Sequence, residues 1–278
     1  MTIAEWLKDA ANELADNLFP TARLDAEVIL AHTIRKNRTY LHAHGDDELS
    51  ARNEDIANAR LELRLDHVPI AYIIGHKEFY GRRFAITPAV LVPRPESEEL
   101  ITILKTLLPA SAALPGVAAK RLVDIGSGSG CLGITAKLEF PELDVALVDT
   151  SRHALGVAEK NAATLGADVE TYVSDLLNDY PYSPDLIIAN LPYVAREWDV
   201  SPELLHEPEE ALYADDDGLS IVKRCIEQVA RRAKPGAYLL LEADTRQLAT
   251  IAAFAGRHGF KETARGGFSL CLHLPTHR

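Results

Sequence analysis

The sequence predicts an α/β protein, in which a helical N-terminal region precedes a mainly parallel sheet covered by helices. One observation is an apolar run, 121–125, that leads into the glycine-rich stretch Gly126-Ser-Gly-Ser-Gly130. Another is the alternation of short apolar runs with helical stretches through the rest of the chain. A third is the helical spacing of apolar residues over 1–75, after which the period changes. The chain is therefore expected to form two regions that meet near residue 75.

Composition places the protein among globular proteins of a reducing compartment. Of the 278 residues, 47% are hydrophobic and 25% are charged, as in soluble domains. No apolar run reaches the length of a membrane span, and the N-terminus lacks a signal-peptide pattern. The cysteines at 131, 225 and 271 are widely separated and predict no disulfide framework. We therefore expect a cytoplasmic protein with no membrane partner.

The charge of the chain argues against a protein that binds nucleic-acid backbones. The net charge is −12 and the isoelectric point is about 5.3, whereas phosphate backbones attract basic surfaces. No direct DNA binding is therefore expected. His42 and His44 form a candidate ligand pair, but the sequence offers no third ligand, so no metal site is expected.

Residues 1–75 are predicted to form a small helical bundle. Two segments in it, 35–38 and 60–64, are locally basic in an acidic chain. The simpler interpretation of these segments is a solvated helix face, and the alternative is a docking surface for a partner. Because a bundle beside a cofactor-binding domain usually recognises the substrate, substrate recognition is the role expected for this region.

Residues 76–95 are predicted to form a connector. Its first part has the pattern of a β-hairpin that turns at Gly81. Prolines at 93 and 95 hold the following segment extended, because each restricts its own backbone and that of the preceding residue. A helix is expected from Ser97 to Leu107. The Ala- and Pro-rich residues 109–119 have the composition of a loop.

The glycine-rich stretch is the first candidate site. A buried strand, a glycine turn and a helix over 131–140 form half of a mononucleotide-binding unit. Glycines let the backbone pass close to a ligand, because a Cβ there would collide with it. The helix N-terminus then offers free N–H groups. The alternative is a tight strand-to-helix turn without a ligand.

Asp149 strengthens the interpretation as a nucleotide-type site. It ends a second apolar run about 20 residues after the glycines, where such folds place a carboxylate that binds ribose hydroxyls. The alternative role is to cap the helix from Arg152 to Leu165, but Ser151 is suited to that role. The two segments leave a dinucleotide and S-adenosylmethionine open, although the G-x-G-x-G spacing is unlike that of a dinucleotide site.

Two further strands end in polar residues. The strand over 169–173 leads to Asp175, which is placed to accept from an adenine amino group or, alternatively, to cap a turn. The strand over 185–190 runs directly into Leu191-Pro-Tyr193. Asn190 thus lies at the carboxyl end of a central strand, where open α/β sheets build their sites.

The C-terminal third completes the predicted sheet. A helix is expected over 218–233, a strand over 237–241 and a helix over 247–258. Two last strands follow, from about Lys261 and from 269 to 274. Only a tight Gly-Gly connection joins them, so they must be antiparallel.

Together these motifs resemble a family. Asp-Ile-Gly-Ser-Gly-Ser-Gly (124–130), Asp149 and Asn190-x-Pro-Tyr193 resemble the S-adenosylmethionine-dependent methyltransferases with seven strands. Gly75-His-Lys-Glu-Phe-Tyr, Leu91-Val-Pro-Arg-Pro-Glu-Ser-Glu98, His206-Glu-Pro and Asp217-Gly-Leu219 are similar to motifs of the peptide chain release factor N5-glutamine methyltransferases, and the order of motifs is kept over nearly the whole chain. The resemblance implies a seven-stranded Rossmann-like class I methyltransferase domain over 96–278, behind the bundle and the hairpin connector.

The resemblance also implies cofactor, substrate and site residues. The cofactor would be S-adenosylmethionine, converted to S-adenosylhomocysteine, and the substrate the glutamine of a Gly-Gly-Gln loop on a class 1 release factor. On this basis the expected cofactor-binding residues are Asp124, Gly126, Ser127, Gly128, Ser129, Gly130, Asp149, Asp175, Leu176 and Asn190. The expected catalytic and substrate-binding residues are Asn190, Leu191, Pro192 and Tyr193, with Arg94 and Glu98 as further substrate contacts.

The chemistry of the Asn190 segment can be argued from the residues themselves. An amide nitrogen is a poor nucleophile, because its lone pair is delocalised into the carbonyl. The Asn190 side-chain oxygen and the Leu191 carbonyl are each placed to accept one N–H of the substrate amide, which would align the nitrogen with the methyl group. They would also stabilise the positive charge that develops on nitrogen. Tyr193 would stack on the amide plane and exclude water.

Two positions depart from the family pattern. The pattern is Asn-Pro-Pro-Tyr, and here Leu191 replaces the first proline. The backbone carbonyl is kept, but a more mobile loop is expected because a proline is lost. Leu176 stands where the family often carries an aromatic residue, so adenine would meet an aliphatic wall.

Several other functions compete with release-factor methylation. The nearest is the sister activity on a glutamine of a large-subunit ribosomal protein, which the segments 206–212 and 217–219 resemble. An adenine-N6 DNA methyltransferase shares the Asn-x-Pro-Tyr chemistry but needs a basic cleft. A cofactor-binding module without catalysis is possible if Leu191 has disabled the site. A nicotinamide oxidoreductase is disfavoured, because no hydride-transfer feature is present. A monomer is expected.

Overall fold

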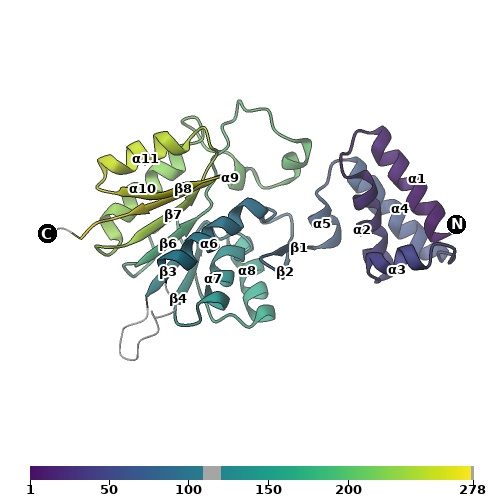
Figure 1. Cartoon of the computed structure of the whole chain (residues 1–278), viewed down its shortest axis with the longest axis horizontal. Helices are drawn as coiled ribbons and strands as arrows, with labels where there is room; N and C mark the ends of the chain where they lie inside the picture. The colour runs from purple at the N-terminus through teal and green to yellow at the C-terminus, as the bar shows by residue number, and fades with distance from the viewer. Residues whose placement is uncertain (109–119, 277–278) are drawn as a thin grey trace. The chain divides into compact units, whose positions relative to one another are not determined.

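The computed structural model of the chain describes residues 1–108 and 120–276 (Figure 1). The predicted loop over 109–119 lies outside the described residues. The chain divides into two compact units, of which the first contains Met1–His76 and Ser201–His206 and the second contains the remaining described residues. The sequence had placed a boundary after residue 75 and did not anticipate the inclusion of 201–206. The separate connector over 76–95 stays a prediction, because this division does not isolate it.

The first unit is helical, as predicted. Its helices are α1 (Ile3–Asp16), α2 (Ala22–Ile34), α3 (Arg38–Ala43), α4 (Ala51–Leu65) and α5 (Ile70–Ile74). Helix α1 begins at Thr2, where the threonine and Glu5 side chains each accept the backbone N–H of the other residue. The apolar stripe of α1 faces a core that includes Trp6 and Leu14, both nearly inaccessible to solvent. The Trp6 indole N–H donates to Asn58 Oδ1 at 2.7 Å, which joins α1 to α4.

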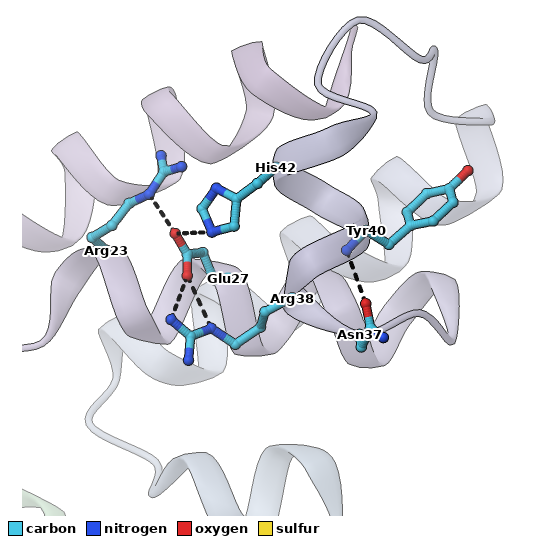
Figure 2. Close-up of polar contacts among 6 residues, drawn as sticks. All are labelled: Arg23, Glu27, Asn37, Arg38, Tyr40 and His42. Atoms are coloured by element: carbon cyan, nitrogen blue, oxygen red, sulfur yellow. Dashed lines mark hydrogen bonds and ion pairs between the residues drawn. The ribbon is translucent and has the colours of Figure 1, made fainter.

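The first basic segment is tied into the bundle (Figure 2). Arg38 donates two hydrogen bonds to Glu27 Oε2, at 2.7 and 2.9 Å, and Arg23 donates to Glu27 Oε1 at 2.8 Å. His42 Nε2 lies 3.5 Å from Glu27 Oε1, so this histidine has a carboxylate partner. Burial raises the pKa of Glu27, but the hydrogen bonds from the two arginines outweigh it and the pKa is lowered overall. Arg38 therefore holds α3 against α2.

The second basic segment supplies a buried arginine. Arg64 is 3% exposed, so for this residue the expectation of a solvated helix face was wrong. Its Nε donates to Asp25 Oδ2 at 2.8 Å, and its Nη2 donates to Glu203 Oε1 at 2.5 Å. The guanidinium also lies over the ring of Phe19. The contact with Glu203 explains why residues 201–206 group with the first unit.

The predicted hairpin is present and turns at Gly81. Strand β1 (His76–Phe79) pairs with β2 (Arg82–Ala85). The two connecting residues, Tyr80 and Gly81, have φ values of +50° and +70°. Positive φ at both positions is characteristic of a type I′ turn, whose twist matches that of the paired strands.

The second unit is built on the predicted mixed sheet. Within the described residues this sheet has seven strands in the order β5-β4-β3-β6-β7-β9-β8. All pairs are parallel except those of β9 with β7 and with β8, which confirms the antiparallel end. The strands are β3 (Arg121–Ile125), β4 (Asp144–Asp149), β5 (Glu170–Val173), β6 (Leu186–Ala189), β7 (Tyr238–Glu242), β8 (Lys261–Gly266) and β9 (Ser269–His273).

Helices cover both faces of the sheet (Figure 1). They are α6 (Glu98–Leu107), α7 (Cys131–Glu139), α8 (Arg152–Leu165), α9 (Glu209–Leu212), α10 (Ser220–Arg232) and α11 (Leu248–Arg257). Helices α10 and α11 pack on the face formed by Val123, Ile187, Leu239 and their neighbours. Helix α7 packs on the opposite face, where Gly133 lies against Leu147. None of the helices among the described residues is long and apolar enough to cross a membrane.

The strand order determines where a ligand can bind. From β3 the chain continues to β4 on one side, while β6 adds on the other side. At such a switch point the connections leave in opposite directions, so a crevice opens at the carboxyl ends of the strands. The glycine turn after β3 and Asn190 after β6 both lie at this edge, as the sequence predicted.

Candidate active site

One pocket at this edge gathers most of the predicted site residues. It has an empty volume of about 1070 Å³, including its open mouth, and lies entirely within the second unit. The predicted site residues that line it are Arg94, Gly126, Ser127, Gly128, Ser129, Asp149, Asp175, Leu176, Asn190, Leu191 and Pro192. Asp124, Gly130, Tyr193 and Glu98 are outside its lining.

The glycine turn presents its backbone to the pocket. The N–H groups of Gly126 and Ser127 both donate to the Val148 carbonyl, at 2.8 and 3.1 Å, which fixes the turn against β4. Gly128 has φ +52°, and no atom lies within 4 Å of the place where its Cβ would be. Only a ligand in the pocket could meet a side chain there, which is the expected property of a cofactor cradle. Gly130, by contrast, packs against Ile134 inside the fold.

Asp124 supports the turn from beneath. It is 1% exposed, and its Oδ2 accepts the N–H of Gly133 in the first turn of α7 at 2.8 Å. Burial raises the pKa of this carboxyl to about 7, although the hydrogen bond from Gly133 opposes the rise. Its Oδ1 is buried without a hydrogen-bond partner among the described residues, and so is the Ser127 hydroxyl.

Asp149 holds the turn with both carboxylate oxygens. Oδ2 accepts from Gly128 N at 2.9 Å, and Oδ1 accepts from Ser151 N at 2.8 Å. Ser151 itself caps α8 by accepting from Ala154 N, so the capping role falls to the serine as expected. Burial raises the pKa of Asp149, opposed by these N–H groups. A carboxylate can accept about four hydrogen bonds in all, so Asp149 keeps acceptor capacity for a ligand hydroxyl.

The segment after β5 forms another part of the wall. Asp175 is exposed, and its carboxylate hydrogen-bonds the Arg224 guanidinium. This ion pair is a partner that the sequence did not predict. Leu176 is 5% exposed and has φ +55°, so its side chain turns inward at the pocket. It provides the aliphatic wall expected from the sequence.

The Asn190 segment lies beside the cofactor turn, because it follows β6, the strand paired with β3. Asn190 Nδ2 donates to Ser97 Oγ at 3.1 Å and to Glu242 Oε1 at 3.0 Å. Leu191 is 3% exposed, and its Cδ2 lies 3.0 Å from the place where a Cβ on Gly126 would be. Because Gly126 has no side chain, a leucine at 191, which is larger than the proline of the family pattern, fits against the glycine turn. This burial favours an ordered loop over the looser one expected from the loss of proline.

Glu242 is a buried carboxylate that the sequence analysis missed. It ends β7, is 1% exposed, and accepts from Tyr193 Oη at 3.4 Å as well as from Asn190. The Tyr193 side chain is thus directed at this carboxylate and lies outside the pocket lining. The available signal was the same one that identified Asp149, an acid directly after a buried strand.

A second missed contact holds the backbone after Asn190. Gln247 is 5% exposed, and its Nε2 donates to the carbonyls of Tyr193, at 2.9 Å, and Asp217, at 2.7 Å. The backbone of Gly218 approaches Tyr193 so closely that a Cβ there would lie 2.0 Å from the Tyr193 carbonyl oxygen. Gln247 and Gly218 therefore fix the course of the chain beyond Tyr193.

The proline-rich segment reaches the pocket through Arg94 and Ser97. The Arg94 guanidinium pairs with Glu207, whose Oε2 also accepts from Val92 N at 2.8 Å. This buried glutamate joins the segments that the sequence had related to one family by resemblance. Glu98 faces elsewhere, because its Oε1 accepts from Tyr80 N at 2.8 Å in the hairpin turn. The structure therefore brings Arg94, but not Glu98, into the pocket.

The residues present fit a nucleoside cofactor that carries an amino acid. Asp149 lines the pocket beside the glycine turn, where it suits the hydroxyls of a ribose. Two buried atoms without a hydrogen-bond partner among the described residues lie close by: Ser127 Oγ in the pocket lining, suited to a carboxylate, and Asp124 Oδ1 at the end of β3 beneath it. S-Adenosylmethionine carries all of these groups.

Comparison with known proteins gives consistent matches along the chain. Residues 5–75 match the PrmC N-terminal domain family, and residues 103–237 match the methyltransferase small domain family. The release factor glutamine methyltransferase of Koribacter versatilis is 37% identical, over 87% of this chain and 86% of that protein. The enzyme of the same name from Deinococcus radiodurans is 33% identical, over 95% of this chain and 94% of that protein.

Solved structures agree on the fold. A methyltransferase from Pyrococcus furiosus matches with a TM-score of 0.53 and 16% identity, over 78% of this chain and 98% of that one. The catalytic domain of human Mettl16, solved with an RNA hairpin, matches with a TM-score of 0.52 and 16% identity, over 82% and 83% of the two chains. At this identity the likeness concerns the fold alone.

Proposed function

Because the chain belongs to the release factor glutamine methyltransferase family, we propose that it methylates the glutamine of the Gly-Gly-Gln motif in class 1 release factors. The methyl donor would be S-adenosylmethionine, and the methylated atom the side-chain amide nitrogen, N5. The sister activity on a ribosomal protein is not favoured, because the curated relatives carry the release-factor name.

The observation that carries the proposal is the arrangement of Asn190 in the pocket. Two hydrogen bonds use the two N–H groups of its side chain, to Ser97 and Glu242. The remaining polar atom of the side chain is the acceptor Oδ1. Asn190 lines the same pocket as the glycine turn. An acceptor beside a cofactor cradle suits a substrate that offers N–H groups, as a primary amide does.

The reaction requires placement of a weak nucleophile. The cofactor supplies an electrophilic methyl group on a sulfonium. Asn190 Oδ1 and the Leu191 carbonyl would each accept one N–H of the glutamine amide, which aligns the nitrogen and stabilises its developing positive charge. In the proposed transfer an N–C bond would form to the substrate amide while the C–S bond of the donor would break, giving S-adenosylhomocysteine as product. The nitrogen then loses one proton to water.

The walls of the pocket have supporting roles in this proposal. Gly128 and Asp149 would hold the ribose side of the cofactor, and Leu176 would contact the adenine. Leu191 is buried between the cofactor turn and the substrate side, where it would limit the access of water. The first unit would bind the body of the release factor, the role expected of the bundle from the sequence.

Mass spectrometry of methylated substrates tests the proposal. The purified protein would be incubated with S-adenosylmethionine and either a class 1 release factor or the large-subunit ribosomal proteins. We expect a gain of one methyl group at the Gly-Gly-Gln glutamine. Asn190→Ala should reduce kcat by about 10²- to 10³-fold, the range found when one transition-state hydrogen bond is removed.

The controls separate the alternatives. A release factor with Gly-Gly-Glu in place of Gly-Gly-Gln should gain no methyl group, because its carboxylate has no N–H to donate. A gain on a ribosomal protein alone would move the chain to the sister activity. Cofactor binding without methylation of any protein would contradict the proposed function.

A further inference from the structure

The carboxyl end of β7 carries a buried glutamate that has no role in the reaction proposed above. Glu242 is 1% exposed, and no ion pair reaches it from the described residues. Burial raises the pKa of its carboxyl, and hydrogen bonds from Ser97, Tyr193 and Asn190 oppose the rise. Burying a carboxylate without a cation is unfavourable, so such a group is retained where it serves a purpose.

The partners of Glu242 all come from the substrate side of the pocket. Asn190 Nδ2 and Tyr193 Oη both reach its Oε1, at 3.0 and 3.4 Å. Ser97, which accepts from Asn190 Nδ2 at 3.1 Å, also lowers the pKa of Glu242. The carboxylate therefore contacts the Asn190 amide and the Tyr193 hydroxyl, and Ser97 accepts from the same Asn190 amide nitrogen.

A carboxylate can orient an amide because it only accepts hydrogen bonds. An asparagine side chain has a donor end and an acceptor end of almost the same shape, so packing alone cannot choose between its two orientations. Glu242 can accept only from Nδ2. With Nδ2 turned to Glu242 and Ser97, Oδ1 is the end that remains for the pocket.

We propose that Glu242 is a positioning residue that sets the orientation of the Asn190 amide, and thereby makes the pocket accept the N–H groups of an amide substrate. The inference rests on the proposed function. If the Asn190 amide were turned over, it would present N–H groups to the substrate NH2, and no hydrogen bond would form. The same orientation rejects a glutamate side chain, whose carboxylate would face Oδ1.

Glu242→Gln tests the orientation with almost no change in volume. Its amide N–H group would take either the place of Oε1, facing the donors of Asn190 and Tyr193, or that of Oε2, which has no hydrogen-bond partner among the described residues. Both placements weaken the hydrogen bond between Asn190 Nδ2 and the side chain at 242. We expect kcat for the release factor to fall about 30- to 100-fold, while the cofactor Kd stays within threefold.

A matched control is Asp185→Asn, the same acid-to-amide change at the opposite edge of the sheet. Asp185 accepts from Arg121 N at 2.9 Å and Lys234 Nζ at 2.7 Å, and none of these three residues lines the pocket. We expect its kcat to stay within twofold of the wild type. A similar loss in both variants would indicate a general effect on the sheet and overturn the proposal.

A double-mutant cycle separates positioning from a merely structural role. Glu242→Gln would be measured in the wild type and in Asn190→Ala. If Glu242 acts through Asn190, its substitution should cost less than threefold in the Asn190→Ala background. The same loss in both backgrounds, or an unchanged kcat in the single variant, would overturn the proposal.

Hydrogen exchange of the Asn190 side chain tests the role of Glu242 without methylation of a substrate, so this test can fail independently of the proposed function. In ¹⁵N-labelled protein, the Asn190 side-chain NH2 signals, assigned by their loss in Asn190→Ala, should exchange slowly with solvent in the wild type and at least tenfold faster in Glu242→Gln. Equal exchange rates would overturn the proposal even if no substrate were methylated. Slow exchange in a wild-type protein that methylates nothing would contradict the proposed function alone.

Discussion

The two sides of the pocket are held in different ways. On the cofactor side, the glycine turn is fixed by Val148 and Asp149, which belong to the neighbouring strand. On the substrate side, Asn190 is fixed by Ser97 and Glu242, which lie 93 and 52 residues away in the chain. The cofactor side thus depends on one strand–turn–helix unit and the next strand. The substrate side depends on segments from most of the second unit, so substitutions far from Asn190 in sequence should disturb it.

Gly218→Ala should give the largest effect and act on the substrate side only. Gly218 has φ +80°, and an added Cβ would lie 2.0 Å from the Tyr193 carbonyl oxygen, so the chain beyond Asn190 must shift. We expect kcat to fall on the order of 10²-fold, since small displacements of aligned groups carry such losses. Methylation rates and cofactor titrations would be compared.

The control for this variant is Gly156→Ala in α8, where a Cβ meets no atom within 4 Å. This change should leave kcat unaltered and stabilise the protein by roughly 0.5–1 kcal/mol. If kcat were unchanged in Gly218→Ala, or if cofactor affinity fell as much as kcat, the cofactor side and the substrate side would not be held independently.

Gly128→Ala should act on the cofactor side only. The added Cβ meets no protein atom within 4 Å, so the fold should be preserved. The only cost to its stability is the backbone strain of a side chain at φ +52°, on the order of 1 kcal/mol. The Cβ would lie where the cofactor is expected, so we predict a cofactor Kd raised about tenfold. Calorimetric titration measures this Kd. An unchanged Kd would mean that the turn does not approach the cofactor.

The pH dependence of stability should identify the buried acid beneath the cofactor turn. Burial raises the pKa of Asp124 from its ordinary 3.8 to about 7. The folded state thus holds a proton that the unfolded chain has lost, so this contribution to stability is complete below pH 4 and is lost as the pH rises to 7. Asp124→Asn does not titrate. The free energy of unfolding of Asp124→Asn should therefore rise relative to that of the wild type by on the order of 1–3 kcal/mol between pH 4 and 7.

Urea unfolding of both proteins without cofactor, at several pH values, measures the difference for Asp124. Parallel stability curves for the two proteins would show that the carboxyl is ionised in the folded state throughout this range.

Leu191→Pro should have the smallest effect. It restores the proline of the family pattern and keeps the backbone carbonyl at 191. The buried Leu191 side chain would lose part of its packing against the cofactor turn, at a cost of about 1 kcal/mol. We expect kcat to stay within threefold and the midpoint of urea unfolding to fall slightly. A tenfold change in kcat would show that residue 191 has a larger part in the site than its carbonyl supplies.

The difference between the two sides also explains which residues could be predicted. The sequence identified the cofactor turn, Asp149 and the Asn190 segment, because each follows directly on a recognisable buried strand. It missed Glu242 and Gln247, although Glu242 carries the same signal at the end of β7. Glu98, expected to contact the substrate, lies outside the pocket lining and accepts from Tyr80 N in the hairpin turn. A motif marks a segment but not the direction of each side chain in it.

The sequence by itself determined the fold class, the helical first unit, the hairpin that turns at Gly81 and the two segments that meet at the sheet edge. These features depend on local patterns of hydrophobicity and on glycine, whose effects reach only a few residues. The tertiary structure decided which atoms face the pocket. The buried carboxylate of Glu242 meets Asn190, and Glu207 meets Arg94, only because the sheet order brings distant segments together. Hydrogen bonds act over about 3 Å, so such pairings follow from folded coordinates and leave no periodic trace in the sequence.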